Sequence, residues 1–148
     1  MANERLSRTD YRSLAEFRFQ IRRFQHFSEK AARKSGINPA QHQLLLALKG
    51  IPAETVPSIG HLAERLFLRH HSTVELVDRL ERRGLVRREP GVTDRRQVLV
   101  RITSRGDRLL EQLSLIHRAE LRSGGVSLLR SLQMLVVPTS ARLKRQGP

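Results

Sequence analysis

Apolar residues recur at intervals of three and four along most of this chain, which is the spacing of one face of an α-helix. From Asp10 to about Ser35 this spacing predicts a long helix. Its apolar stripe consists of Leu14, Phe17, Ile21, Phe24 and Ala31. Asn38 and Pro39 then supply an N-cap and a first helical residue, so the run HQLLLALKG after them predicts a short buried helix.

Two further helices are predicted in the middle of the chain. Ser58 can cap a short helix, IGHLAERLF, and a turn at Leu68, Arg69 and His70 separates it from a second, amphipathic helix. That second helix carries Thr73, Leu76, Val77 and Leu80 on its apolar side, and His71, Glu75, Arg79 and Arg82 on the opposite side. Two short helices joined by a tight turn form the helix-turn-helix arrangement.

After Gly84, which can end the helix at a positive φ, the helical spacing gives way to strand-like alternation. Strands are predicted at residues 85–88 and 98–102, and Pro90 and Gly91 are expected to break the first of them. The loop between the strands carries Asp94, Arg95 and Arg96. A helix followed by a β-hairpin with arginines at its loop is the layout of a winged helix.

The rest of the chain returns to helical spacing. Thr103 can cap a helix that runs to about Leu121, and a Ser-Gly-Gly sequence at residues 123–125 interrupts it. A last helix is predicted to end or kink at Pro138. It contains Leu128, Leu129, Leu132 and Leu135.

We therefore predict a single chain of residues 1–148 that is mainly α with a small antiparallel β wing, in the α+β class. Its winged helix-turn-helix region is expected at residues 38–106, between helical segments at 10–35 and 107–145. Five of the six aromatic residues lie in the first helix, which is more than one small winged domain could cover. That helix is interpreted as half of an oligomer interface, with an ordinary intrachain core as the alternative.

The charge of the chain indicates what kind of partner it binds. The net charge is +14, and arginine supplies 24 of the 28 cations, which favours a polyanion as partner. A GC-rich genome would also raise the arginine content.

Cysteine is absent, so thiol chemistry is excluded, and no run is apolar enough for a signal peptide or a membrane span. A cytoplasmic protein with no membrane partner is expected.

The expected DNA contacts lie on the second helix and on the wing, because an α-helix fits the major groove and arginines are attracted to a narrow minor groove. Arg79 has an alternative as an ion-pair partner of Glu75, and the wing loop has one as a solvated turn with an internal salt bridge. The helix contacts are expected at His70, His71, Ser72, Thr73, Glu75 and Arg79. The wing contacts are expected at Arg87, Arg88, Asp94, Arg95 and Arg96.

The run LAERLFLRHHSTVELVDRLERRGLVRR, followed by DRR and then by TSRG, resembles the MarR family of winged-helix transcriptional regulators. The spacing of Gly84, Asp94, Arg96, Thr103 and Gly106 agrees with that family's pattern without a gap. The resemblance covers roughly residues 10–145. It implies that Arg96 enters the minor groove and that Asp94 holds the shape of the wing.

The resemblance also implies a homodimeric repressor that binds double-stranded DNA at an inverted repeat and is released by a small phenolic or anionic effector. The family's effector pocket lies between the dimer helices and the winged domain, which draws attention to His42. Sensing through cysteine is excluded because the chain has none. The expected dimerisation residues are Leu14, Phe17, Ile21, Phe24, Leu128, Leu132 and Leu135.

The alternative function is a non-specific architectural DNA-binding or RNA-binding protein that uses the same charge. An enzyme is not expected, because the sequence carries no phosphate-binding glycine loop, no His-Glu metal motif and no nucleophile elbow. His70 and His71 diverge by about 100° around a helix, so they do not form a metal site. No cofactor and no metal are predicted.

Overall fold

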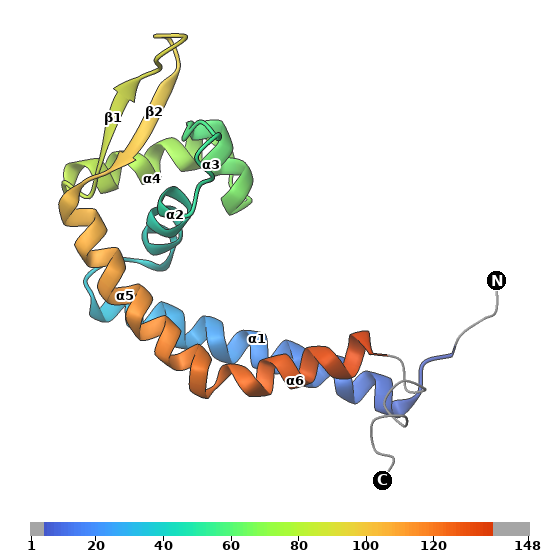
Figure 1. Ribbon diagram of the computed structural model, residues 1–148. Coiled ribbons are helices and arrows are strands. Elements are labelled where there is room, and N and C mark those ends of the chain that lie inside the picture. Colours follow the sequence, from blue (N-terminus) through green and yellow to red (C-terminus); the bar gives the residue numbers. More distant parts are fainter. Residues whose placement is uncertain (1–4, 138–148) are drawn as a thin grey trace. The chain divides into compact units, whose positions relative to one another are not determined.

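The computed structural model describes residues 5–137 and contains six helices and one two-stranded antiparallel sheet within them (Figure 1). The helices are α1 (Arg8–Lys34), α2 (Pro39–Lys49), α3 (Ile59–Leu66), α4 (His70–Arg82), α5 (Ser104–Ser123) and α6 (Gly125–Val136); the strands are β1 (Val86–Pro90) and β2 (Val98–Ile102). The predicted mainly α fold with a small β wing is confirmed. Pro138 and the predicted helical residues 138–145 lie outside the described residues.

The chain divides into two compact units. The winged unit is Glu29–Ile116, and the flanking unit consists, among described residues, of 5–28 and 117–137. The predicted winged region, residues 38–106, lies wholly inside the winged unit. The helices α1 and α5 each have one end in each unit.

Side-chain caps start the helices of the winged unit where the sequence predicts them. The Asn38 Oδ1 atom accepts a hydrogen bond from the Gln41 amide at 2.8 Å, and the Asn38 amide donates to Gln41 Oε1 at 3.0 Å, which completes a capping box. The Ser58 hydroxyl accepts from the His61 amide at 3.1 Å at the start of α3. These local bonds satisfy amide groups that a helix cannot satisfy itself.

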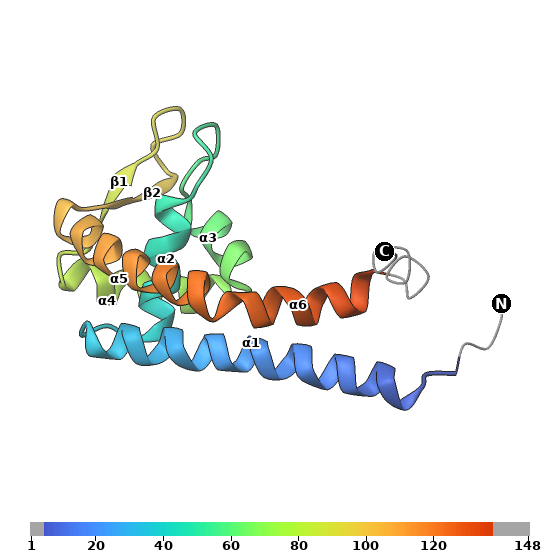
Figure 2. The same ribbon diagram turned by 60° about the horizontal axis from the view of Figure 1, so that its bottom comes forward.

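The hydrophobic core of the winged unit lies under the apolar sides of α2, α3 and α4. Its fully buried members include Leu44, Leu45, Leu62, Val77, Leu80, Val100 and Leu113. As predicted, α2 is a central helix, and its His42 is buried along with Leu44, Leu45 and Leu48, whereas Leu46 is exposed. The hairpin covers this core at Leu85, Val86 and Val100 (Figure 2).

Several predicted boundaries differ from the structure. The helix α3 ends at Leu66, and Phe67 adopts a left-handed conformation with φ of 53°, exposed at 98%. The turn of the helix-turn-helix ends at Arg69, so His70 is already helical. The strand β1 continues through Pro90, which pairs with Val98. Proline is tolerated there because β1 is an edge strand of a two-stranded sheet, where a ring nitrogen on the open side leaves no ladder hydrogen bond unmade.

The strand predicted at residues 85–88 does not alternate at its start, because Leu85, which precedes β1, and Val86 are both buried. The hairpin is also held by a contact along the free edge of β2. The Val100 amide of β2 donates to the Pro57 carbonyl at 2.8 Å, and Leu99 forms a bridge with Ser58. The connector before α3 thus extends the sheet, a contact between distant segments that the local pattern does not show.

The flanking unit has almost no apolar interior of its own. In Figures 1 and 2 its α1 segment and α6 run side by side. Among its described residues, however, the buried side chains are only the polar Gln20, Ser28 and Ser131. His117 bonds Ser28 Oγ at 2.7 Å, and the rings of Phe24 and Phe27 meet the His117 ring edge-on at centroid distances of 6.1 and 5.6 Å.

The first helix begins two residues earlier than predicted. The Ser7 hydroxyl and amide both donate to Asp10 Oδ2 at 2.7 Å, and these bonds hold the pKa of Asp10 below its ordinary value. No described helix is long and apolar enough to span a lipid bilayer.

The junction between the hairpin and α5 is unusually close. Thr103 caps α5, as predicted, by accepting from the Gly106 amide at 3.1 Å, and its hydroxyl donates to the Gly84 carbonyl at 2.7 Å. A Cβ atom at position 106 would lie 2.1 Å from the Leu85 carbonyl oxygen. Only glycine therefore lets α5 approach the backbone that leads into β1.

We predict that Gly106→Ala lowers the free energy of unfolding by about 1–3 kcal/mol or more, because the backbone must move to relieve the clash. The matched control is Gly60→Ala in α3, where a Cβ atom would meet nothing closer than 3.9 Å. The control should be neutral or slightly stabilising. Urea denaturation at one protein concentration measures both, and equal stability of the two variants would contradict the prediction.

Candidate nucleic-acid interface

The outer side of α4 is exposed because its inner side is committed to the core. Thr73, Leu76, Val77 and Leu80 are buried, whereas the side chains on the opposite face point to solvent. The exposed predicted contacts are His70, His71, Glu75 and Arg79, with Ser72 half-buried. The second helix of the helix-turn-helix therefore offers a polar face of the right size for a major groove.

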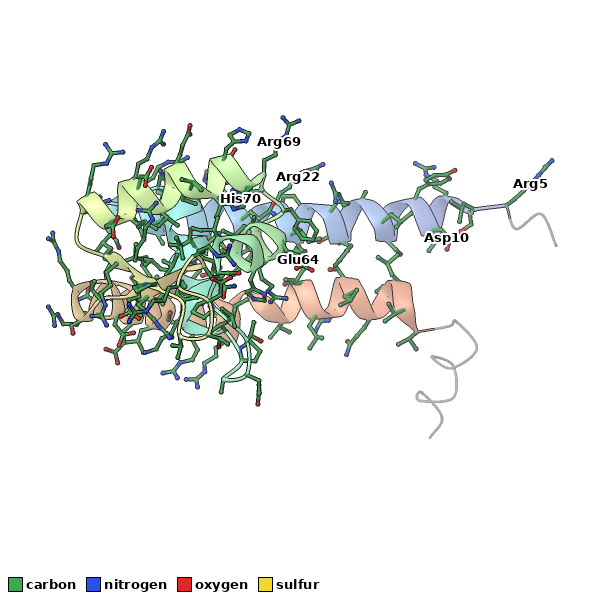
Figure 3. All side chains as sticks on the ribbon, turned by 90° about the horizontal axis from the view of Figure 1, so that it is seen from above. Arg5, Asp10, Arg22, Glu64, Arg69 and His70 are labelled. Atoms are coloured by element: carbon green, nitrogen blue, oxygen red, sulfur yellow. The ribbon has the colours of Figure 1, made fainter. Side chains whose placement is uncertain are left out.

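One predicted contact is wrong and one candidate was missed. Thr73 is fully buried, and its hydroxyl donates to the Arg69 carbonyl at 3.1 Å, so it cannot reach DNA from this position. Arg69 is exposed at the N-cap of α4 and lies beside His70 in Figure 3. Sequence reasoning placed Arg69 in a turn, although a cation directly before a helix could have drawn attention.

Glu75 and Arg79 are both exposed, and no ion pair joins them among the described residues. The predicted alternative for Arg79, a structural partnership with Glu75, thus has no support in this geometry. Arg79 is free to meet a phosphate or a base edge. Contact of either residue with DNA stays a prediction.

The loop of the wing is shaped by Asp94. Its carboxylate accepts from the Arg96 amide at 3.0 Å, and its carbonyl accepts from the Gln97 amide at 3.0 Å. The Gly91 amide donates to the Gln97 carbonyl at 2.7 Å, and a Cβ atom on Gly91 would lie 2.3 Å from the Asp94 carbonyl oxygen. These contacts fold the loop tightly, as the role implied for Asp94 requires.

Arg96 is the most exposed ion-paired side chain of the wing. Its Nε atom lies 3.4 Å from Asp94 Oδ1, but the Arg96 side chain is 94% exposed. A pair this exposed is worth at most about 1 kcal/mol, so the guanidinium can exchange the carboxylate for a phosphate. Arg95 is also exposed. The internal salt bridge and the DNA-facing role are thus compatible.

The arginines of β1 point to opposite faces of the strand. Arg87 Nη2 lies 2.7 Å from Glu89 Oε1, and Arg101 of β2 donates to the other Glu89 oxygen at 3.2 Å. The hydrogen bond from Arg87, with a smaller one from Arg101, outweighs desolvation and lowers the pKa of Glu89. Arg88 turns toward α4 instead, where it contacts the carboxylates of Asp78 and Glu81.

A groove of about 530 Å³ lies between the start of α3, the start of α4 and the outer part of the wing. His70 and Val74 line it from α4, and Arg88, Arg96 and Gln97 line it from the hairpin. The exposed guanidinium of Arg96 at the edge of this groove suits a polyanion backbone. Among the described residues, no cluster of His, Asp and Glu is arranged to hold a metal ion.

A helix-turn-helix followed by a basic hairpin defines a winged-helix DNA-binding protein. Comparisons with known proteins make the class specific. The model of the MarR family matches residues 35–97. YkoM, an uncharacterized HTH-type transcriptional regulator of Bacillus subtilis, is 30% identical over 109 residues, which are 72% of this chain and 69% of YkoM. The chain belongs to the MarR family of transcriptional regulators, whose members bind DNA and are not enzymes.

Solved structures agree with this assignment. AbsC, a MarR family regulator from Streptomyces coelicolor, is 21% identical, and the match covers 97% of this chain and 100% of AbsC with a TM-score of 0.73. CouR from Rhodococcus jostii RHA1, solved with p-coumaroyl-CoA bound, is 30% identical, with 76% of this chain and 82% of CouR covered and a TM-score of 0.57. The predicted family and fold are confirmed.

We predict that Arg96→Ala weakens binding to duplex DNA and reduces the slope of log K against log salt by about one, because one phosphate contact is lost. Lys49→Ala is the control, since it removes the same charge from α2, where Lys49 pairs with Asp107 at 2.8 Å. Fluorescence anisotropy over a salt series measures both slopes. An unchanged slope and affinity for Arg96→Ala would show that the wing assignment is wrong.

Proposed function

We propose that the protein is a homodimeric repressor that recognises an inverted-repeat operator and is released from it by a small phenolic or anionic compound. The dimer is supported mainly by the exposed apolar surface of the flanking unit. No hydrophobic side chain among its described residues is buried, although many are large. Leaving such a surface in water is unfavourable by roughly 25 cal/mol per Å², so a second copy is the expected cover.

The residues predicted for dimerisation fit this proposal. Leu14 and Leu132 are exposed, and the remaining five are only partly buried. Those five are Phe17, Ile21, Phe24, Leu128 and Leu135. They come from both segments of the flanking unit, α1 and α6, so each copy would contribute two helices to a helical bundle. Burial between two copies also accounts for the aromatic residues concentrated in α1.

A two-fold dimer determines the form of the operator. Each copy presents one recognition helix, so the DNA site must repeat with inverted symmetry. The centres of the two half-sites are expected about one helical turn apart or a small multiple of it, in steps of roughly 34 Å. The wings would add contacts beside the half-sites through Arg95 and Arg96.

Release by a small molecule needs a compound that prefers a dimer whose helix spacing does not match the operator. The proposal is supported by the similarity to CouR, whose structure contains p-coumaroyl-CoA. A carboxylate or phosphate on such a compound would suit a chain with a net charge of +14.

The dimer is tested by Leu132→Arg, which should give a monomer because it places a charge in the apolar surface. Gln133→Arg adds the same charge at the next position of α6, about 100° around the helix, and should leave the dimer intact. Sedimentation equilibrium measures the mass of both variants. If Leu132→Arg stays dimeric, this surface is not the interface.

The operator and the effector are tested together by selecting bound duplexes from a random pool. We expect an inverted repeat that binds at least about 10³-fold more tightly than a scrambled duplex of the same composition. Aromatic acids and their coenzyme A thioesters are then added to the selected complex, and at least one should release the DNA. Equal binding to scrambled DNA or to RNA would instead support the non-specific alternative.

A further inference from the structure

We propose that Arg88 is a positioning residue that locks the wing onto the recognition helix α4 through Asp78 and Glu81, and that it does not bind phosphate. This inference rests on the proposed recognition of an operator by α4 and the wing together. It changes the role predicted from the sequence, which placed Arg88 among the phosphate contacts.

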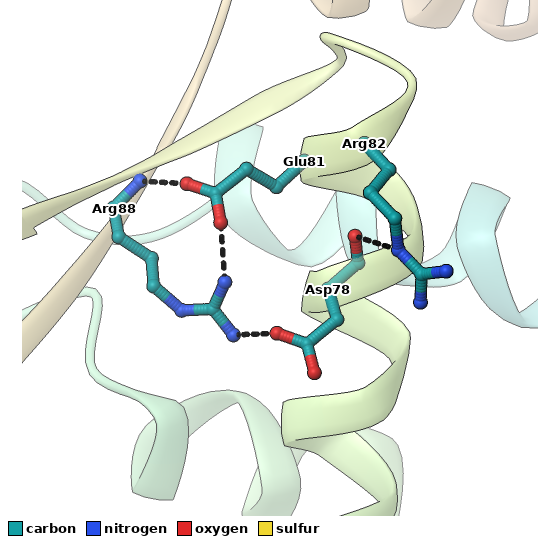
Figure 4. Close-up of polar contacts among 4 residues, drawn as sticks. All are labelled: Asp78, Glu81, Arg82 and Arg88. Carbon is teal, nitrogen blue, oxygen red and sulfur yellow. Dashed lines mark hydrogen bonds and ion pairs between the residues drawn. The ribbon is translucent and has the colours of Figure 1, made fainter.

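The contacts form a closed unit, shown in Figure 4. The Arg88 guanidinium contacts Glu81 Oε2 through Nη1 and Asp78 Oδ1 through Nη2, so each carboxylate takes a different nitrogen. The Arg88 amide also donates to Glu81 Oε1 at 3.0 Å. Asp78 and Glu81 are three residues apart on α4 and therefore face the same side of the helix. The side chain and the backbone of β1 are both tied to α4.

The charges explain why Arg88 has little left for DNA. Two carboxylates hold one guanidinium, and the Arg88 side chain is only 26% exposed. Partial burial by itself would lower the pKa of Arg88, but the hydrogen bonds and charges of Asp78 and Glu81 together outweigh it, so the pKa is raised. A phosphate would have to displace one of these carboxylates against their combined attraction.

The other cations of the hairpin differ. Arg87 and Arg101 share a single carboxylate, Glu89, and Arg96 is almost fully exposed. Among the residues that the structure describes, no other ion pair joins α4 to either strand. Arg88 therefore has a place in the wing that its neighbours do not share.

The consequence is geometric. The recognition helix and the wing meet different parts of the duplex, so their separation must match the DNA for both sets of contacts to form at once. Arg88 also lines the groove between α3, α4 and the hairpin, so its loss would change the wall of that groove. A loosened wing would lose affinity without any loss of a phosphate contact.

The salt dependence separates this role from phosphate binding. We expect Arg88→Met to weaken binding to the selected duplex by about tenfold, comparable to the loss of one base-pair contact, with the slope of log K against log salt unchanged. Arg96→Ala should reduce that slope by about one. A reduced slope for Arg88→Met would overturn the proposal.

The acids give a second test, because the two roles predict effects of opposite sign. Removing an acid near phosphates ordinarily tightens binding. Glu64→Ala, which removes an exposed acid of α3 that forms no ion pair among the described residues, is expected to do so. Glu81→Ala removes the same charge from α4, yet it should weaken binding because Arg88 loses one of its partners. Tighter binding by Glu81→Ala would contradict the proposal.

Circular dichroism and thermal unfolding check that each variant folds. If Arg88→Met is unfolded, Arg88→Lys replaces it, since lysine keeps the charge but cannot reach two carboxylates with a planar fork. It should weaken binding at an unchanged salt slope, and wild-type affinity would overturn the proposal. If instead the wild type binds the selected and scrambled duplexes equally, the proposed function fails, and the signs of the Glu64 and Glu81 effects on either duplex still test Arg88.

Discussion

The burial of one side of α4 is the constraint on which the rest of this structure depends. Leu76, Val77 and Leu80 complete the core of the winged unit, so the helix can rotate only at the expense of apolar contacts. The same packing leaves Glu75 and Arg79 in solvent. The surface that we propose for DNA recognition thus has its orientation set by side chains that are buried in the core.

Besides the burial of Val86 and Val100, polar contacts of three kinds attach the wing to this core. The Val100 amide bonds the connector before α3, the Thr103 hydroxyl bonds the Gly84 carbonyl, and Arg88 meets the acids of α4. A two-stranded hairpin is marginally stable by itself, so these attachments are what make it a defined element. These contacts fix the strands that hold the exposed tip of the wing, which contains Arg95 and Arg96.

Arginine accounts for most of the positive charge, but the individual arginine side chains have different partners. Arg88 is enclosed by two acids, Arg87 and Arg101 share Glu89, and Arg96 is nearly free. The composition therefore overstates the charge that is available to a polyanion. The flanking unit shows the corresponding limit for apolar residues, because its periodic stripes acquire no buried interior within one chain.

Interactions between residues close in the chain are enough to predict many of the helix boundaries of this protein. The caps at Asn38, Ser58 and Thr103 and the stop at Gly84 depend on bonds or dihedral angles within a few residues, so the amino-acid sequence by itself was enough to locate them. Helical spacing likewise assigned the buried side of α4, and the joint spacing of helix, wing and glycine identified the family.

Only the tertiary structure decided which polar side chains remain available. Arg88 and Arg87 are adjacent and chemically identical, and nothing local distinguishes them. Arg88 faces Asp78 and Glu81 because strand residues alternate between faces and because β1 packs beside α4. The exposure of Arg69 depends in the same way on contacts between elements. The burial of Thr73, in contrast, agrees with its predicted place on the apolar side of α4. The sequence determined the elements and their apolar faces, which are local properties, whereas the pairing of charges required residues far apart in the chain to meet.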